Sequence, residues 1–308
     1  MRTRTLLVAA LVALVSAAPS YRPRPVPPPS DACAGPDRRA VSGPQRAWST
    51  PLDRSATLRA RGASWVGTDA YAVTFEGTAP SSCLSHGTLI GTWNDTDAWS
   101  RWHGRGAIRF SQPRFSVIGV HVVNNGDGVK AKDAAGGSAQ DFTIRGSWIQ
   151  HVHDDCVEND YLHSGVIRNN LFDGCYVLFS ARPWRSGIDG RTNLLQISRN
   201  VAALEPMRSV FRGPGPGTGG FFKWSADAPG VVLTDNVLMA SQVPNHGTLD
   251  PPTGPLLCAR NVIVWTGAGP FPSAAAWRER CPDTVITTDG TRFTKARQAW
   301  MKDHPRVG

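Results

Sequence analysis

The octapeptide GVIRNNLF at residues 165–172 decides the fold, because close copies of it return along the chain. Each copy has a short strand of alternating apolar residues, then a small or amide residue, then a second apolar strand. Strands this short, with apolar residues at every second position, favour β-structure over amphipathic helices. The copies are FSVIGVHV at 115–122, FTIRGSWI at 142–149, LQISRNV at 195–201, VVLTDNVL at 231–238 and LLCARNVI at 256–263.

The turn of each copy holds a glycine or an asparagine, and the steps between successive turns are 27, 24, 30, 36 and 25 residues. Uneven periods with short strands and variable connections are typical of a β-solenoid. Its repeats stack about 4.8 Å apart, so an asparagine at one corner can adopt left-handed backbone geometry and hydrogen-bond to neighbouring repeats. Alternatively, the asparagines only mark ordinary loops. We expect an all-β, right-handed parallel β-helix. The turn residues are Gly119, Gly146, Asn170, Asn200, Asn236 and Asn261.

The flanking sequence predicts further strands and a covered end. Short helices are expected at 273–280 and 294–302, where they would cover sheet edge and core at the last repeat. An aromatic-rich excursion at 93–102 is interpreted as a loop packed on the solenoid rather than as a sugar-stacking platform. A glycine- and proline-rich loop is inserted at 213–220. Opening strands are expected at 56–60, 71–75, 87–91 and 106–110.

The N-terminus has the pattern of a secretory signal peptide, with Arg2 and Arg4, an apolar run at 6–15 and small residues at 16–18. No later segment approaches the roughly 20 apolar residues of a membrane span. We therefore expect a soluble, secreted protein. The predicted segments are the signal peptide at 1–18, a proline-rich linker and N-terminal arm at 19–50, the parallel β-helix at 51–270 and a C-terminal capping segment at 271–308.

Six cysteines form an even set, which fits disulfide bonding in an exported chain. Their pairing cannot be read from sequence alone. Cys258 with Cys281 is favoured by proximity, Cys33 with Cys83 would tie the N-terminal arm to the body, and Cys156 with Cys175 would stack inside adjacent repeats. The sequence has no C-x-x-C pair, which disfavours a zinc knuckle.

The formal net charge of +9 falls to +7 when Arg2 and Arg4 leave with the signal peptide. A basic surface attracts anionic partners such as uronic-acid polymers, although nucleic acid or a membrane surface would be attracted equally. The charge is diffuse rather than concentrated in a run, so we expect no nucleic-acid partner.

Acidic residues follow three successive predicted strands, in NGDG at 125–128, HDDC at 153–156 and FDGC at 172–175. Equivalent places on adjacent repeats would bring Asp127, Asp154 or Asp155, and Asp173 onto one face. Carboxylates a few ångströms apart repel, which raises at least one pKa and supplies an acid and a base at one pH. Glycoside cleavage needs this pairing, and an inverting hydrolase places its carboxyls about 6.5 to 9.5 Å apart.

This stretch resembles the polygalacturonase-like branch of the pectin-lyase-like β-helix superfamily. NGDG at 125–128 matches that branch's Asn-x-Asp-Gly motif, and DDCV at 154–157 matches its Asp-Asp-Cys motif one repeat later. The resemblance implies that Asp154 is the general acid and that Asp127 and Asp155 activate water.

Two further motifs of that branch depart from the pattern. No histidine lies near residues 173–175, where the resemblance places a Gly-His-Gly turn. In FFKW at 221–224, Lys223 matches the lysine of Arg-x-Lys, but Phe221 replaces the arginine. Substrate recognition must therefore differ from that of a polygalacturonase.

Other charged or polar residues are candidates for substrate binding. Arg182 could bind an anionic substrate or pair with the acidic row, and His153 could equally be a stacked structural side chain. The acidic residues themselves could be turn residues that accept backbone hydrogen bonds. The substrate-binding candidates are Lys130, His153, Asp173, Arg182 and Lys223.

A calcium-assisted polysaccharide lyase is the nearest alternative to a hydrolase. Calcium would be held by Asp154, Asp155 and Glu158, with Asp160 nearby. Lys130, Lys132 or Arg182 would be the base. A hydrolase would need neither metal nor cofactor.

A third alternative is a non-catalytic solenoid that binds polysaccharide or forms a surface structure, because one fold hosts many functions. Convergence of Asp127, Asp154 and Asp155 in an open groove would favour an enzyme. In every case we expect a polysaccharide partner, and a monomer.

Overall fold

The computed structural model describes residues 33, 37–52, 54–67, 70–92, 94–132, 141–211, 215–305 and 307. Strands make up 46% and helices 10% of the structure, so the predicted all-β class is confirmed. The predicted signal peptide at 1–18, most of the linker, Trp93 and residues 213–214 lie outside the described residues.

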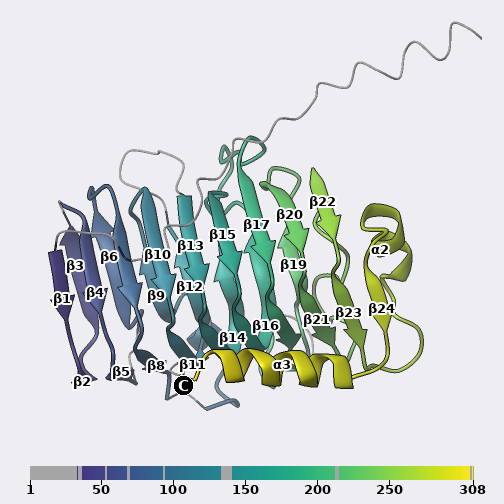
Figure 1. The fold of residues 1–308 in the computed structure, drawn as a ribbon, viewed down its shortest axis with the longest axis horizontal. Coiled ribbons are helices and arrows are strands. Elements are labelled where there is room, and N and C mark those ends of the chain that lie inside the picture. The colour runs from purple at the N-terminus through teal and green to yellow at the C-terminus, as the bar shows by residue number, and fades with distance from the viewer. Residues whose placement is uncertain are drawn as a thin grey trace, which may run out of the picture.

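The strands form three ladders of parallel pairs, through which the chain passes repeatedly in the same order. The first ladder is a separate sheet, and the second and third belong to one larger sheet. In Figure 1 the strands stand side by side from β1 to β24. The arrangement is compatible with a solenoid.

The first ladder contains, in spatial order, β1 (Asp37–Ala40), β4 (Ala56–Arg59), β7 (Ser82–Ser85), β10 (Arg114–Ile118), β13 (Asp141–Arg145), β15 (Ser164–Arg168), β17 (Leu194–Ser198), β20 (Gly230–Thr234) and β22 (Leu256–Ala259). The second contains β2 (Gly43–Gln45), β5 (Ala63–Val66), β8 (Thr88–Ile90), β11 (His121–Asn125), β14 (Trp148–Glu158), β16 (Leu171–Ala181), β18 (Val201–Leu204), β21 (Val237–Ala240), β23 (Val262–Trp265) and β24 (Val285–Thr287). The third contains β3 (Trp48–Leu52), β6 (Val73–Gly77), β9 (Gly106–Phe110), β12 (Asp127–Ala131), the C-terminal halves of β14 and β16, and β19 (Gly220–Trp224).

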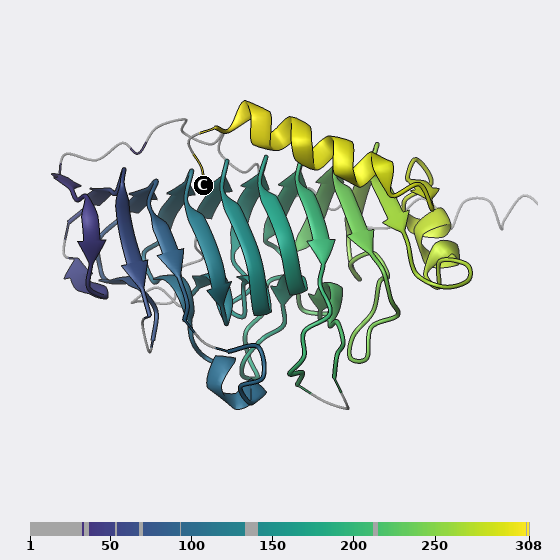
Figure 2. The same cartoon turned by 90° about the horizontal axis from the view of Figure 1, so that it is seen from below.

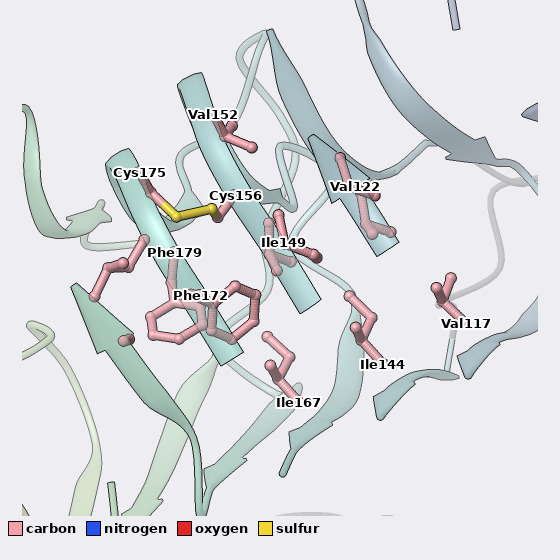
Figure 3. Close-up of a cluster of buried hydrophobic side chains, with 14 of the residues drawn as sticks. Val117, Val122, Ile144, Ile149, Val152, Cys156, Ile167, Phe172, Cys175 and Phe179 are labelled. Atoms are coloured by element: carbon pink, nitrogen blue, oxygen red, sulfur yellow. A yellow bond between two sulfur atoms is a disulfide. The ribbon is translucent and has the colours of Figure 1, made fainter. Parts of the chain in front are cut away.

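The interior is a continuous stack of apolar side chains, because register places like residues above one another. Val117, Ile144 and Ile167 are aligned in the first ladder, and all three are buried (Figure 3). Nearby, the rings of Phe110 and Phe115 stack at 4.3 Å. Burial of apolar surface shared between repeats is the main stabilising contribution in such an array.

The predicted asparagine ladder is present, and all four asparagines are fully buried. Asn170 donates its backbone and side-chain N–H groups to Oδ1 of Asn200, both at 3.0 Å. Asn200 bonds Asn236 in the same way, and Asn236 bonds Asn261. Each amide also donates to a carbonyl of the preceding repeat, as Asn200 does to Ile167.

The expectation that these asparagines adopt the left-handed conformation is wrong by one residue. Positive φ occurs at the residue before each ladder asparagine, for example 55° at Asn169 and 56° at Arg199. Gly119 and Gly146, also at positive φ, align with Asn169 rather than with Asn170. One residue therefore turns the chain, and the next directs its amide into the core.

Two short helices follow the last strands, close to the predicted positions. α2 (Ala274–Arg280) lies beyond β23 at the end of the sheets, and its Trp277 is buried in the core. α3 (Thr291–Asp303) instead runs back along the outer face of the second ladder (Figures 1 and 2). Its Phe293 and Trp300 pack on Leu171 and Val201, so α3 covers a sheet face rather than the end.

Three disulfides join all six cysteines, and each pairing considered from the sequence is confirmed: Cys33–Cys83, Cys156–Cys175 and Cys258–Cys281. They indicate an oxidising location outside the cytoplasm. Among the helices that the structure describes, none has the length and apolar character needed to cross a membrane.

Replacing Asn200 with alanine tests the asparagine ladder. The change removes the acceptor of two Asn170 N–H groups and the side-chain donor to the Ile167 carbonyl, and each buried unsatisfied group costs about 1 to 3 kcal/mol. We expect the free energy of unfolding in urea to fall by about 3 kcal/mol or more. The control Gln196→Ala, an outward-facing change in the same repeat, should alter it by less than about 0.5 kcal/mol. Equal effects of the two variants would show that the ladder is not a special source of stability.

Candidate functional site

Asp127, Asp154 and Asp155 converge into one group, here called the acidic cluster. One carboxylate oxygen from each lies within 4.8 Å of the others. Asp127 begins β12, and the two other residues lie in β14, one repeat later. The pairing of β14 with β16 shifts register between Val152 and Asp155. Such a bulge re-aims side chains, which allows consecutive residues to reach the same cluster.

Each member of the acidic cluster has its own hydrogen-bond partner. The Tyr71 hydroxyl donates to Asp127 Oδ2 at 2.7 Å. Lys223 Nζ donates to Asp155 Oδ2, also at 2.7 Å. Nδ1 of His103 lies 3.3 Å from Asp154 Oδ2. The Tyr71 hydroxyl, the Lys223 ammonium group and the His103 ring each contact one carboxyl group and so help to hold the three together.

A second ion pair borders the cluster. Lys130 Nζ contacts Glu158 Oε2 at 2.5 Å, and these residues are register partners between β12 and β14. Ser180 and Lys223 continue the same row across β16 and β19. Ser180 donates to Asp160 at 3.3 Å. Parallel register thus places Lys130, Glu158, Ser180 and Lys223 in one row along the third ladder.

Burial and mutual repulsion separate the acidities of these carboxyls. Burial, reinforced by Glu158 and Asp154, raises the pKa of Asp127 well above its usual range. Burial raises the pKa of Asp155 to about 7, although Lys223 opposes the shift. Burial also acts to raise the pKa of Glu158, but Lys130 and hydrogen bonds from Asp160 and Asp127 outweigh it and lower that pKa to about 2. The site therefore holds both protonated and ionised carboxyls near neutral pH.

The cluster is buried, which differs from the open groove expected for an enzyme. Asp127 is 2%, Asp154 6% and Asp155 1% exposed. Their oxygens also lie closer than the roughly 6.5 to 9.5 Å separation of carboxyls in inverting hydrolases. Asp155 Oδ1 is buried without a hydrogen-bond partner in the described structure.

A covering segment accounts for part of this burial. α1 (Trp99–Trp102) and the residue after it lie against the cluster, and His103 contacts Asp154. The Trp99 ring stacks on His103 at 4.4 Å and contacts Phe211 at 4.7 Å. In Figure 2, α1 projects from the side of the sheets opposite α3. Trp102 is fully buried, so the predicted packing of this excursion on the body is confirmed.

The predicted substrate-binding residues lie in different surroundings. Lys130 and Lys223 are part of the cluster's surroundings through Glu158 and Asp155. Arg182 is exposed directly after β16. His153 is buried beside the cluster, where its ring stacks on Trp102 at 3.5 Å.

The expected alignment of Asp173 with the cluster is wrong. Asp173 is the register partner of Gln150 in the second ladder, not of Asp154 or Asp155. Its side chain points to α3, where Arg297 donates to it at 2.8 Å. Asp173 therefore lies before the corner between the second and third ladders, whereas Asp155 lies after that corner.

Tyr71 and His103 were not identified from the sequence. Tyr71 precedes β6 and is 56 residues from Asp127. His103 follows α1 and is 51 residues from Asp154. Neither belongs to a motif, because only stacking of repeats and the return of the α1 segment bring them to the carboxylates.

Asp160 allows a test of the buried charges through stability. Burial and Glu158 raise its pKa to about 8, so the folded state holds a proton that the unfolded state releases above about pH 4. Stability should therefore fall as pH rises from about 4 to 8, by up to about 1.4 kcal/mol per pKa unit. In urea unfolding between pH 5 and 9, Asp160→Asn should lose much less stability than the wild type.

Asp189→Asn is the control for that series. Asp189 is exposed, and its hydrogen bond with Arg191 lowers its pKa to about 2, so it stays ionised in both states over this range. Its removal should leave the pH profile unchanged. Parallel profiles for the wild type and Asp160→Asn would contradict the assigned protonation of Asp160.

No family model, curated protein or solved structure matches this chain. The resemblance to the pectin-lyase-like superfamily therefore rests on the motif residues at 125–128 and 154–157.

Proposed function

We propose that this chain is a right-handed parallel β-helix of the pectin-lyase-like superfamily and a secreted glycosidase that cleaves an anionic polysaccharide. The repeated order of the three ladders and the asparagine ladder support the fold. Right-handed crossovers are the rule between parallel strands. The observation that carries the function is the convergence of Asp127, Asp154 and Asp155 from successive repeats.

The three carboxyls divide the chemical roles by position. Asp154 is the most exposed of them, and as general acid it would protonate the glycosidic oxygen of a bound sugar. Asp127 and Asp155 lie deeper, where Asp127, kept protonated by its raised pKa, would bind a water molecule and Asp155 would deprotonate it. Asp155 Oδ1 has no hydrogen-bond partner among the residues that the structure describes, so it has a lone pair for that water. Lys223 would stabilise the carboxylate form of Asp155.

Surface residues near the cluster support a carbohydrate that carries negative charge. Trp184 is 55% exposed and its backbone N–H donates to the Asp160 carbonyl, so an aromatic face lies beside the acidic row. The guanidinium carbon of Arg185 lies 5.0 Å from the centre of the Trp184 ring. Arg182, two residues before Trp184, is exposed. Sugar rings pack on aromatic faces, and arginine binds carboxylates.

Binding requires movement of the covering segment. His103 contacts Asp154 and is itself held by Trp99, which contacts Phe211. A sugar oxygen that approaches Asp154 would have to displace the His103 ring. His103 is largely exposed, so this displacement would not disrupt the core.

Two alternatives are each favoured by one observation. The convergence of three carboxylates and the unpartnered Asp155 Oδ1 would suit a cation, as a calcium-assisted lyase requires. The low exposure of the cluster would suit a non-catalytic polysaccharide-binding solenoid in which the acidic row is structural.

Product analysis on uronic-acid and neutral polysaccharides tests the glycosidase. We expect the wild type to release new reducing ends without unsaturated products. Asp154→Asn should reduce the rate by about 100-fold or more, because a general acid contributes about 10²- to 10⁴-fold. Asp173→Asn is the matched control, since Asp173 comes from the third acidic motif but pairs with Arg297 away from the cluster, and it should retain activity.

Other outcomes would select an alternative. Unsaturated products that a chelator suppresses would establish the lyase. Absence of any product from correctly folded protein, together with retention on a polysaccharide column, would establish the binding solenoid.

A further inference from the structure

A second group of potential ligands lies outside the acidic cluster. It consists of Asp95, His151 and His153, and one ligand atom from each lies within 4.8 Å of the others. Asp95 Oδ1 is 2.9 Å from His151 Nε2 and 3.7 Å from His153 Nε2. In a tetrahedral site with bonds of about 2.0 to 2.1 Å, neighbouring ligand atoms are about 3.3 Å apart. One observed distance is shorter than this value and the other is longer, so small side-chain movements would bring both to it.

We propose that Asp95, His151 and His153 bind a divalent transition-metal ion of the zinc class. Two imidazoles and one carboxylate are ligands that suit Zn²⁺ and similar ions, and they disfavour Ca²⁺ and Mg²⁺, which prefer oxygen alone. Asp95 is 45% exposed whereas His153 is fully buried. The site is therefore open to solvent on one side and rigid on the other. This proposal does not depend on the proposed function.

The backbone at His151 fixes where its imidazole points. His151 has φ of 53°, in the left-handed region that is unfavourable for residues with a side chain. The register partners of its neighbours place it level with Asn124 in the preceding repeat and Gly174 in the following one. Both of these residue types tolerate that conformation better. Positive φ recurs at this corner, 55° at Asn124 and 100° at Gly174, so the fold sets the conformation of His151 and thereby fixes the direction of its imidazole toward Asp95.

The other ring nitrogen of His151 has the partner that a metal-bound histidine usually has. Nδ1 lies 3.0 Å from Glu205 Oε2. Histidines that bind metals commonly donate the second N–H to a carboxylate, which fixes the tautomer and directs the free lone pair at the ion. Donation from Nδ1 to Glu205 leaves Nε2 facing Asp95. Between the two carboxylates, Nε2 can hold either a proton or a metal ion.

His153 is positioned by its surroundings before any ion binds. Its ring stacks on Trp102 with planes 5° apart, and Nε2 lies 3.1 Å from Asn124 Oδ1. Its Nδ1 has no hydrogen-bond partner within the described residues, so no donor prevents Nδ1 from carrying the proton while Nε2 binds an ion. Asn124 Oδ1 is near enough to add an amide oxygen.

The turn that carries Asp95 is also ordered locally. The Asn94 N–H donates to Asp97 Oδ2 at 3.1 Å, and Thr96 donates to Asn94 Oδ1. This turn leads directly into α1, which covers Asp154 through His103. An ion between Asp95 and the two histidines would therefore fasten the covering segment to β14.

Calorimetric titration of the full-length protein with ZnCl₂, after dialysis against chelator, tests the site. We expect one equivalent to bind and the thermal unfolding temperature to rise. Asp95→Asn should weaken the affinity at least about 10-fold, and Glu205→Gln about 10- to 100-fold because His151 Nδ1 loses its carboxylate partner. Asp95 is used because its partial exposure makes folding of the variant secure, which circular dichroism checks.

Two matched variants separate this site from others. Asp97→Asn changes a carboxylate in the same turn that pairs with Arg101, and Asp154→Asn changes the nearby acidic cluster. Both should bind zinc as the wild type does. Absence of zinc binding, or binding that persists in Asp95→Asn but is lost in Asp154→Asn, would overturn the proposal and leave His151 as an imidazolium between two carboxylates.

Discussion

The parallel hydrogen-bonded register between successive repeats is the constraint on which the rest of the structure depends. It aligns Val117 with Ile144 and Ile167 inside, and Lys130 with Glu158 outside. The buried asparagines reinforce it at one corner, where each amide bonds the next repeat and a carbonyl of the preceding one. A shift by one residue would exchange the inward and outward faces of a strand. The core and the charged row are therefore maintained by the same alignment.

The buried carboxyls are tolerated because the same register supplies cations. The charge of Lys130 offsets that of Glu158, and the charge of Lys223 offsets that of Asp155. Asp127 instead contacts the Tyr71 hydroxyl, and its raised pKa keeps it protonated and uncharged. Removing one partner from a buried pair leaves an uncompensated charge, which is strongly destabilising. The acidic cluster can thus have a structural origin and still be suited to acid–base chemistry.

The segment around α1 connects the two groups of ligand residues. Asp95 precedes α1 and contacts His151, while His103 follows α1 and contacts Asp154. Trp102, between them, packs on His153. Because His153, Asp154 and Asp155 are consecutive in β14, any change in how this segment is held would alter access to the acidic cluster.

The sequence alone predicted the all-β class and most strand positions, and it offered the asparagine ladder, three possible cysteine pairings and the convergence of Asp127 with Asp154 and Asp155 as expectations that the structure then decided. These features follow from local periodicity and from repeated motifs, which carry over directly into stacked repeats. Tertiary structure alone decided that Asp173 faces α3, that α3 runs along a sheet face, that Tyr71 reaches Asp127 in β12, and that His103 and Asp95 reach β14. The reason is physical: variable connections and corners set which residue of a motif faces which ladder, and neither is encoded in the local alternation of apolar and polar residues.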